Sequence, residues 1–455
     1  MAEGSLGRQP ASGARIAPPR HGSAPRDDRR RSRSGAGAGS DVLGHRERGA
    51  HAARHGSGAV ALHAVPSEAE RKRRERATAA RVSRFLLLAP TALLTVTGLV
   101  MVFSASSVSA FTTYGSSFWF FNRQLLYAAV GCVLLFLTSR MRYGVWQRLS
   151  LPFLAITLGL LLLALHPAAG TSAYGASRWI DLGAFTLQPS EFAKLGLVAF
   201  AATVLTKKWN KLDEPMHLLI PLGIVVALVA GIVIMQRDLG TTLILVGTIF
   251  LLLFVAGVRL RYLVATGAFG LLCTAYLIFG EGYRRTRLLS FSDPWADAQN
   301  TGYQLIQGLI ALGSGGWFGV GLGASRQKWE FVPNAHTDFI FAIIGEELGF
   351  LGGLAVLALF GLLIYAGIRI AVRAPDTFGR LLAAGITAWI GLQAIVNLGA
   401  VTGLLPITGV PLPLVSFGGS ALIVTLAAIG VLSNIARSSA GPRPGRHRAA
   451  REGRR

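Results

Sequence analysis

Long apolar segments follow one another along most of this chain, with short polar connections between them. A helix needs about 20 apolar residues to cross the ~30 Å of bilayer hydrocarbon. The segments that come close to this length are 85–106, 119–138, 146–166, 189–206, 217–235, 240–257, 262–280, 339–370, 380–402 and 419–436. The pattern predicts an all-α, polytopic membrane protein with ten transmembrane helices. Because segment 339–370 is too long for an untilted span, we expect it to protrude or to kink near Gly349, Gly352 and Gly353.

The polar connections carry a charge pattern that predicts the orientation. If the N-terminus is cytoplasmic, every short inner connection carries Lys or Arg, as the positive-inside rule requires. These basic residues are Arg140, Arg142, Arg148, Lys207, Lys208, Lys211, Arg259, Arg261, Arg369, Arg373 and Arg380. Both termini are then cytoplasmic, and a large extracytoplasmic loop, residues 281–338, lies between spans 7 and 8. Its apolar stretch 301–323 is too Gly-rich to span, so we expect one or two interfacial or re-entrant helices there.

The net charge of +23 belongs mainly to the two ends of the 455-residue chain. Residues 1–84 hold 18 Lys and Arg against 8 Asp and Glu, and residues 436–455 hold 7 against 1. The rest is almost continuously apolar, which excludes a soluble fold and argues against a nucleic-acid-binding protein. We predict a disordered basic cytoplasmic tail at 1–84, a membrane domain at 85–436 and a basic cytoplasmic tail at 437–455. The basic run before the first span orients it and attracts anionic lipid, with docking of a cytoplasmic partner as the alternative.

Acidic residues with potential chemistry gather toward the outer side. Asp338 follows His336 and Thr337 and opens the eighth span. A carboxylate there either caps the helix or acts as a general base at the membrane boundary. Glu346 and Glu347 lie about two turns deeper on different faces of the helix, so we expect at least one of them to be a structural hydrogen-bonding group.

A second polar cluster precedes and opens the fourth span. Glu191 and Lys194 share a helix face, so they either pair to brace two helices or contact substrate. Upstream, Arg178 offers a guanidinium fork for phosphate oxygens, and Trp179 offers an amphipathic ring that also suits a membrane anchor. Asp238, in the turn between spans five and six, either caps the sixth helix or joins the site.

Cations accompany these carboxylates on the outer side, namely Arg178, Arg237, Arg284, Arg285, Arg287, Arg326 and Lys328. Cations beside a base at a membrane surface suit a lipid-anchored phosphate or pyrophosphate substrate, because a diphosphate leaving group needs positive charge to stabilise it. A divalent cation, Mg²⁺ or Mn²⁺, is another way to neutralise a diphosphate, although the sequence shows no spacing of metal ligands.

Sequence motifs in these regions resemble those of the SEDS proteins (shape, elongation, division and sporulation). They are, in order, GASRWIDLGAFTLQPSEFAK, QRDLGTTL, FVPNAHTDFIFAIIGEELGF and LLPITGVPLPLVSFGGSALI. The similarity extends over roughly residues 85–436. Two of its segments, Ile343–Glu347 and Leu414–Gly419, look more like the division member of the family than the elongation member.

The resemblance implies a peptidoglycan glycosyltransferase with ten spans that polymerises lipid II. It also implies a class B penicillin-binding protein, a transpeptidase, as the working partner. It puts the family's essential Asp on Asp338 and its outer-loop Trp on Trp179. The candidate substrate-binding residues are Arg178, Trp179, Gln188, Glu191, Lys194, Asp238, Lys328, His336, Thr337 and Ser416.

With these features, the resemblance implies an enzyme of the bacterial plasma membrane at the division septum. It would join a polyprenyl-diphosphate-linked glycan to a hydroxyl of lipid II, with Asp338 activating the hydroxyl and single displacement inverting the anomeric centre. Two other classes stay open: a lipid II flippase with the same pocket, and a non-enzymatic scaffold that recruits other division proteins. A transporter is expected to carry charged groups near the bilayer midplane on paired broken helices, whereas this chain concentrates them at the outer boundary.

Overall fold

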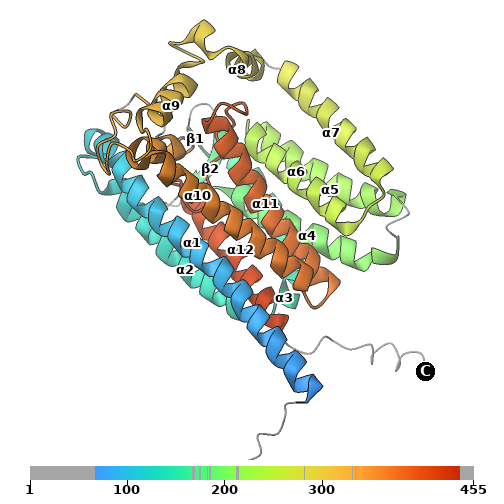
Figure 1. The fold of residues 1–455 in the computed structure, drawn as a ribbon. Helices are drawn as coiled ribbons and strands as arrows, with labels where there is room; N and C mark the ends of the chain where they lie inside the picture. The colour runs from blue at the N-terminus through green and yellow to red at the C-terminus, as the bar shows by residue number, and fades with distance from the viewer. Residues whose placement is uncertain are drawn as a thin grey trace, which may run out of the picture. The chain divides into compact units, whose positions relative to one another are not determined.

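The computed structural model describes residues 67–166, 170–173, 176–181, 183, 186–211, 215–280, 282–329, 331–333 and 335–440. Long helices form the body of this part of the chain (Figure 1). They are α1 (Glu68–Tyr114), α2 (Trp119–Arg140), α3 (Gly144–Leu165), α4 (Pro189–Lys207), α5 (Pro215–Met235), α6 (Leu239–Ala256), α7 (Leu260–Phe279), α10 (Ile340–Arg373), α11 (Thr377–Val401) and α12 (Gly419–Ser438). The predicted tail residues 1–66 and 441–455 lie outside the described residues.

Each predicted apolar segment falls in one of these long helices, which confirms the all-α membrane class. Within the described residues, eight helices are long and apolar enough to cross a membrane. The other two are α4, which carries Glu191 and Lys194, and α5, which qualifies only as a shorter apolar helix over Leu219–Met235. The count of ten spans therefore stays a prediction.

Helix α1 begins at Glu68, so the prediction of a disordered tail is wrong for residues 68–84. Ser67 and Glu70 form a capping box, in which the Glu70 N–H donates to Ser67 Oγ at 3.3 Å. One turn further, Arg71 pairs with Glu75 at 3.3 Å. The prediction weighed net charge and the scarcity of apolar residues, whereas capping and ion pairs one turn apart favour a helix here.

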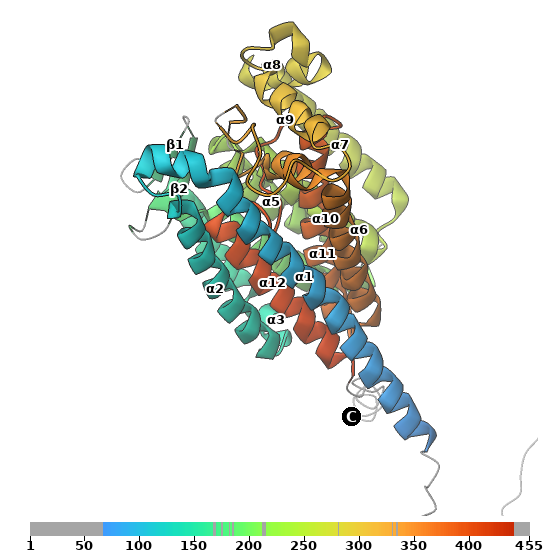
Figure 2. The same ribbon diagram turned by 60° about the vertical axis from the view of Figure 1, so that its left-hand side comes forward.

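Among the helices long and apolar enough to cross a membrane, α12 is the most buried and α7 the least; in the ribbon α12 lies among other helices and α7 at the edge (Figures 1 and 2). Helix α12 packs against α2, α1, α11 and α4, and most of its residues are buried. Small residues allow the approach to α2: a Cβ on Gly430 would lie 2.4 Å from Leu135 O, and Thr138 Oγ1 donates to Ala427 O at 2.9 Å. In α7, by contrast, only Leu263 is buried.

One end of the helices carries several short elements, and we call it the sheet end (Figure 1). A three-stranded antiparallel sheet lies there, which the sequence analysis did not predict. The short elements are β1 (Gly170–Ala173), β2 (Ala176–Asp181), β3 (Thr186–Leu187), α8 (Gly282–Ser292), the 3₁₀ helix η2 (Pro294–Asp297) and α9 (Tyr303–Ser314). Helix α9 confirms the helix expected in the Gly-rich stretch. At the opposite end, α1 begins and α12 finishes, and Arg84 Nε donates to Ser433 Oγ at 3.2 Å.

Helix α10 kinks at Gly349, as its length predicted, because Gly349 has φ 71° and ψ −169°. The residues after α9 run back along the kink and pair with it through backbone hydrogen bonds. Val320 N donates to Glu346 O at 2.9 Å, and Phe350 N donates to Gly316 O at 2.8 Å. This close approach explains the glycines, since a Cβ on Gly319 would lie 2.1 Å from the carbonyl oxygen of residue 347.

The loop between α11 and α12, residues 403–418, packs among the helices without regular structure of its own. Leu412, Leu414 and Val415 are each no more than 3% exposed. Buried backbone outside helices and strands needs other protein groups to satisfy its polar atoms. Gln124 of α2 does part of this, since its Nε2 donates to Ser416 O at 3.1 Å and its Oε1 accepts from the backbone N–H of residue 418 at 3.3 Å.

Candidate active site

Asp338 lies just before α10 at the sheet end. Helix α10 begins at Ile340, and its N-cap, Phe339, makes no side-chain cap hydrogen bond. Asp338 therefore stands two residues before the first helical residue, instead of opening the helix as predicted. The Asp338 side chain keeps part of its surface exposed, and its Oδ1 accepts from Thr337 Oγ1 at 3.1 Å.

His336 fixes the segment that leads into Asp338. Its ring packs against those of Phe120 and Phe417, with centroid distances of 4.4 and 5.7 Å, and these two rings also pack on each other at 5.0 Å. Its carbonyl accepts from Phe417 N at 2.9 Å. Burial among these rings lowers the pKa of His336 to about 4, so the imidazole is neutral near pH 7 and adds no positive charge to the site.

Helix α11 contributes polar side chains to this region that the sequence analysis missed. Gln393 Oε1 accepts from Lys194 Nζ at 2.8 Å and from Trp389 Nε1 at 2.9 Å, while its Nε2 donates to Pro411 O at 2.9 Å. One turn further, Asn397 Nδ2 donates to Asp338 O at 2.8 Å. Their signal in the sequence is a spacing of four residues, which places polar groups on one face of an apolar span.

Glu191 and Lys194 form an ion pair, which is one of the two alternatives that the sequence left open for them. Lys194 Nζ lies 2.8 Å from Glu191 Oε1, and each side chain is only 1% exposed. Lys194 also lies 5.3 Å from the centroid of the Trp389 ring. Through Lys194 and Gln393 the pair braces α4 against α11. Glu191 Oε2 is buried and has no hydrogen-bond partner within the part of the chain that the structure describes.

Arg178 holds the turn between α5 and α6. Its Nε donates to Gln236 O at 3.1 Å and its Nη2 donates to Arg237 O at 2.5 Å. Its Nη1 lies 4.0 Å from Asp238 Oδ2. Asp238 itself caps α6, because its Oδ1 accepts from Thr241 N at 3.0 Å. The guanidinium therefore supports a turn in which Arg237 has the unusual φ of 59°.

The remaining candidates also make contacts within the fold. Trp179 is half-buried on β2, beside Arg178. The backbone N–H of Gln188 donates to Ser420 Oγ at 2.9 Å, which ties the start of α4 to α12. Ser416 is 4% exposed, and its Oγ accepts from the backbone N–H of residue 412 at 2.8 Å.

The two glutamates of α10 and Lys328 form another group. Glu346 Oε1 accepts from Arg326 N at 2.9 Å, and Glu347 Oε1 accepts from Ser104 Oγ at 2.6 Å. Lys328 Nζ donates to the carbonyl of residue 323 at 2.5 Å and lies 3.9 Å from Glu347 Oε1. The prediction of at least one structural glutamate is confirmed, and both glutamates hold the loop that follows α9.

The structure thus places eight of the eleven candidates in three groups. Asp338, Thr337 and His336 connect through α11 to Glu191 and Lys194. Arg178 and Asp238 lie together at the α5–α6 turn, and Lys328 lies with Glu347 beside the kink. Within the described residues, no group of three or more His, Cys, Asp or Glu side chains could hold a metal ion.

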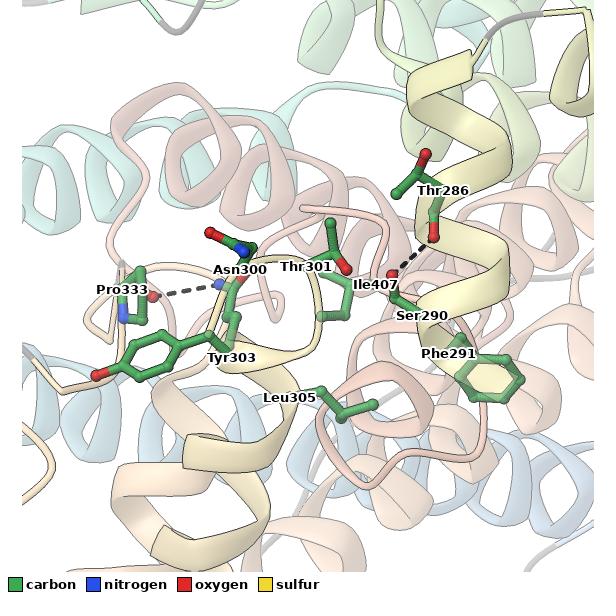
Figure 3. Close-up of a pocket in the computed structure, with 10 residues that line it drawn as sticks. Thr286, Ser290, Phe291, Asn300, Thr301, Tyr303, Leu305, Pro333 and Ile407 are labelled. Carbon is green, nitrogen blue, oxygen red and sulfur yellow. Dashed lines mark hydrogen bonds between the residues drawn. The ribbon is translucent and has the colours of Figure 1, made fainter. Parts of the chain in front are cut away.

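A cavity of about 250 Å³ lies at the sheet end (Figure 3). Two of its lining residues, Pro333 and Ile407, belong to the loops that also carry Asp338 and Ser416. Its lining residues are uncharged, and two of them are hydrogen-bonded to each other, since Gln304 Nε2 donates to Pro333 O at 3.2 Å. None of the predicted site residues lines this cavity. The other lining residues are Thr286, Ser290, Phe291, Asn300, Thr301, Tyr303, Gln304 and Leu305.

Comparison with known families and proteins covers nearly all of the described part of the chain. Residues 84–441 match the FtsW/RodA/SpoVE family model, described as cell cycle protein. Stage V sporulation protein E of Bacillus subtilis (strain 168) is 45% identical over 356 residues, which cover 78% of this chain and 97% of that protein. The probable peptidoglycan glycosyltransferase FtsW of Geobacter metallireducens is 44% identical over 348 residues, covering 76% and 93%.

Solved structures share the fold. A chain from a peptidoglycan synthase complex, solved to show the structural coordination of polymerization and crosslinking, superimposes with a TM-score of 0.62 at 31% identity, covering 77% of this chain and 97% of that one. The rod shape determining protein RodA of Thermus thermophilus gives a TM-score of 0.58 at 29% identity, covering 79% and 97%.

Proposed function

Because this chain belongs to the FtsW/RodA/SpoVE family of cell cycle proteins, we propose that it is a membrane-embedded peptidoglycan glycosyltransferase of cell division. The donor is a glycan strand linked through diphosphate to a polyprenol, and the acceptor is a sugar hydroxyl of lipid II. The relatives named as probable peptidoglycan glycosyltransferases support this activity, since they are similar over nearly their whole length.

One observation supports Asp338 as the catalytic carboxylate. The other carboxylates that the sequence singled out, Glu191, Asp238, Glu346 and Glu347, are each no more than 4% exposed. Asp338 keeps an exposed surface at the sheet end, while its backbone is held by Asn397. A base must reach a substrate proton from a fixed position, and Asp338 combines both properties.

In the proposed reaction, an Asp338 carboxylate oxygen takes the proton from the acceptor hydroxyl. The hydroxyl oxygen then forms a bond to the anomeric carbon, and the bond from that carbon to the diphosphate oxygen breaks. The electron pair leaves with the polyprenyl diphosphate, and the anomeric centre inverts. Positive charge near the leaving group lowers the barrier. Because Arg178 and Lys328 hold loops, the exposed Arg237 and Arg326 suit this role better.

A class B penicillin-binding protein, a transpeptidase, is the proposed partner, and the division septum is the proposed location. The similarity to a chain from a complex that coordinates polymerization with crosslinking supports a transpeptidase partner. The similarity to proteins named FtsW supports a role in division rather than in elongation.

A lipid II flippase is the second candidate, and the kink in α10 is the observation that favours it. Glu346 and Glu347, each 1% exposed, lie directly before the break at Gly349. Transporters use broken helices with charged groups to bind substrate. In this protein both glutamates already bind groups of the chain itself, which argues against transport.

Substitution of Asp338 by Asn tests the proposal. The change keeps the size of the side chain but removes the base, so polymerisation should slow by about 10²–10⁴-fold. The matched control is Asp181→Asn, which removes an exposed carboxylate of β2 at the same end and should change the rate by less than about twofold. Purified protein is reconstituted with a transpeptidase that cannot polymerise, and glycan chains from lipid II are scored on a gel.

Two results would count against the proposal. Chains formed at the wild-type rate by a folded Asp338→Asn protein would reject Asp338 as the base. No chains from the wild-type protein, under any divalent cation or partner condition, would favour the flippase.

A further inference from the structure

Asn397 is a buried amide of α11 that holds two loops of the sheet end at once. Its side chain is 2% exposed. Its Nδ2 donates to Asp338 O at 2.8 Å and to Val410 O at 2.8 Å. The first carbonyl belongs to the residue proposed as the base, and the second belongs to the 403–418 loop.

The orientation of this amide follows from its partners. Carbonyl oxygens only accept hydrogen bonds, so the NH₂ group, with its two donors, must face both of them. The amide oxygen then points away, and Asn397 Oδ1 is buried with no hydrogen-bond partner among the residues that the structure describes. A buried acceptor without a partner opposes folding, so stability alone gives a weak reason for an Asn at this position.

Asn434 of α12 provides the contrast at the opposite end of the helices. It is 1% exposed and also holds the backbone of a connection between helices. Its Oδ1 accepts from Tyr143 N at 3.0 Å and its Nδ2 donates to Ser139 O at 2.8 Å. Both polar atoms of Asn434 are used, as expected for a purely structural clamp.

Asn397 donates its hydrogen bond to a part of the chain that is not helical, the segment containing Asp338. The helical backbone begins only at Ile340, so the position of the carboxylate depends on bonds from neighbouring elements. The carbonyl of His336, two residues earlier, accepts from Phe417 N, at the end of the same 403–418 loop that Asn397 binds. Asn397 thereby holds Asp338 and the loop beside it in register.

We propose that Asn397 is a positioning residue for glycosyl transfer, which sets the place of the Asp338 carboxylate through its backbone carbonyl and through the 403–418 loop. The inference rests on the proposed function. A reacting group displaced by about 1 Å can lose about 100-fold in rate. Because Asn397 touches neither substrate in this scheme, its loss should lower kcat and leave KM for lipid II almost unchanged.

Asn397→Ala and Asn434→Ala form a matched pair for the test, since each removes a buried amide that is hydrogen-bonded to two backbone groups. Asn434→Ala should lower the melting temperature at least as much as Asn397→Ala, because both polar atoms of Asn434 are paired. Asn397→Ala should reduce kcat by about 10–100-fold with KM within about twofold of wild type, while Asn434→Ala should keep kcat within about twofold. Asn397→Ser, whose hydroxyl can donate to one carbonyl, should lie between Asn397→Ala and wild type, and it serves as the test if the Ala variant fails to fold.

The outcomes separate this inference from the proposed function. The positioning role would be rejected if Asn397→Ala kept the wild-type kcat, if both Ala variants lost kcat equally, or if the loss were confined to KM. If Asn397→Ala does not fold, a wild-type kcat in Asn397→Ser would reject it. Absence of polymerisation by the wild-type protein would instead reject the proposed function.

Discussion

Charged side chains of this protein differ more in their surroundings than in their sequence context. Lys194 and Lys72 each pair with a Glu within one turn of helix, yet the first pair is 1% exposed on both sides and the second is 61% and 80% exposed. Burial removes the water that would otherwise stabilise each ion, so the buried partners depend on each other. The exposed pair is screened and contributes little.

We therefore expect Lys194→Met to destabilise the protein strongly. The substitution leaves Glu191 buried without its cation, which costs about 3–5 kcal/mol when one partner of a buried pair is removed. The control, Lys72→Met, leaves the exposed Glu68 in water and should change stability by at most about 1 kcal/mol. Thermal unfolding in detergent measures both. A melting temperature for Lys194→Met equal to that of Lys72→Met would contradict a net stabilising role for the buried pair.

Sequence reasoning identified many polar residues of the sheet end, but it did not predict which groups each of them is hydrogen-bonded to. Arg178 was predicted to bind phosphate, and the structure shows its guanidinium on carbonyls 58 and 59 residues away. A motif shows which side chain stands at a position, whereas its hydrogen bonds depend on how distant segments pack. Gln393 and Asn397 were missed for the same reason, because a polar residue in an apolar span has no visible partner in the sequence.

Glycines determine how closely the irregular elements approach the helices. A Cβ on Gly98 of α1 would lie 2.6 Å from Leu414 O and 2.7 Å from Val415 Cα. Both contacts are with backbone, so no side chain can rotate away. The 403–418 loop therefore lies against α1 only because residue 98 has no side chain.

The corresponding prediction compares two glycines inside helices. Gly98→Ala forces the loop backbone away from α1 and should destabilise the protein by about 1–3 kcal/mol, as overpacking does. Gly159→Ala in α3, where an added Cβ meets nothing within 4 Å, should leave stability unchanged or raise it by up to about 1 kcal/mol. Melting temperatures of the two variants test this, and an unchanged value for Gly98→Ala would show that the loop moves without cost.

The elements themselves were predictable to different degrees. The lengths of the apolar segments predicted where the long helices lie, because a span must match the membrane thickness. Segment 339–370 is longer than a span needs, and its glycines indicated where it would kink. The pairing of residues 316–321 with the kink was not predictable. It is made by backbone hydrogen bonds, which require no particular side chains and so leave no pattern in the sequence. The strands β1 to β3, of two to six residues, are too short for their alternation to be recognised.

At the scale of the whole molecule, the charges along the chain and the structure agree on which helix ends lie together. The inner connections predicted from Lys and Arg all fall at the end opposite the sheet, and the proposed active site falls at the sheet end. Labelling at single cysteines can test this arrangement in membranes. Cys132 and Cys273 are both exposed on their helices, so they have to be replaced first.

In such a cysteine-free background, an impermeant thiol reagent added outside intact cells should label Cys at Ser177 and at Ala324, which lie at the sheet end, but not at Ser139.

Asn210, in the connection between α4 and α5, decides the number of spans. If α4 and α5 both cross, that connection is cytoplasmic, as its Lys residues favour, and Cys at Asn210 should stay unlabelled until the cells are permeabilised. Labelling at Asn210 from outside would mean that α4 and α5 do not cross and that the protein has eight spans. Labelling at Ser139 from outside would overturn the orientation, and with it the access of Asp338 to an extracytoplasmic acceptor.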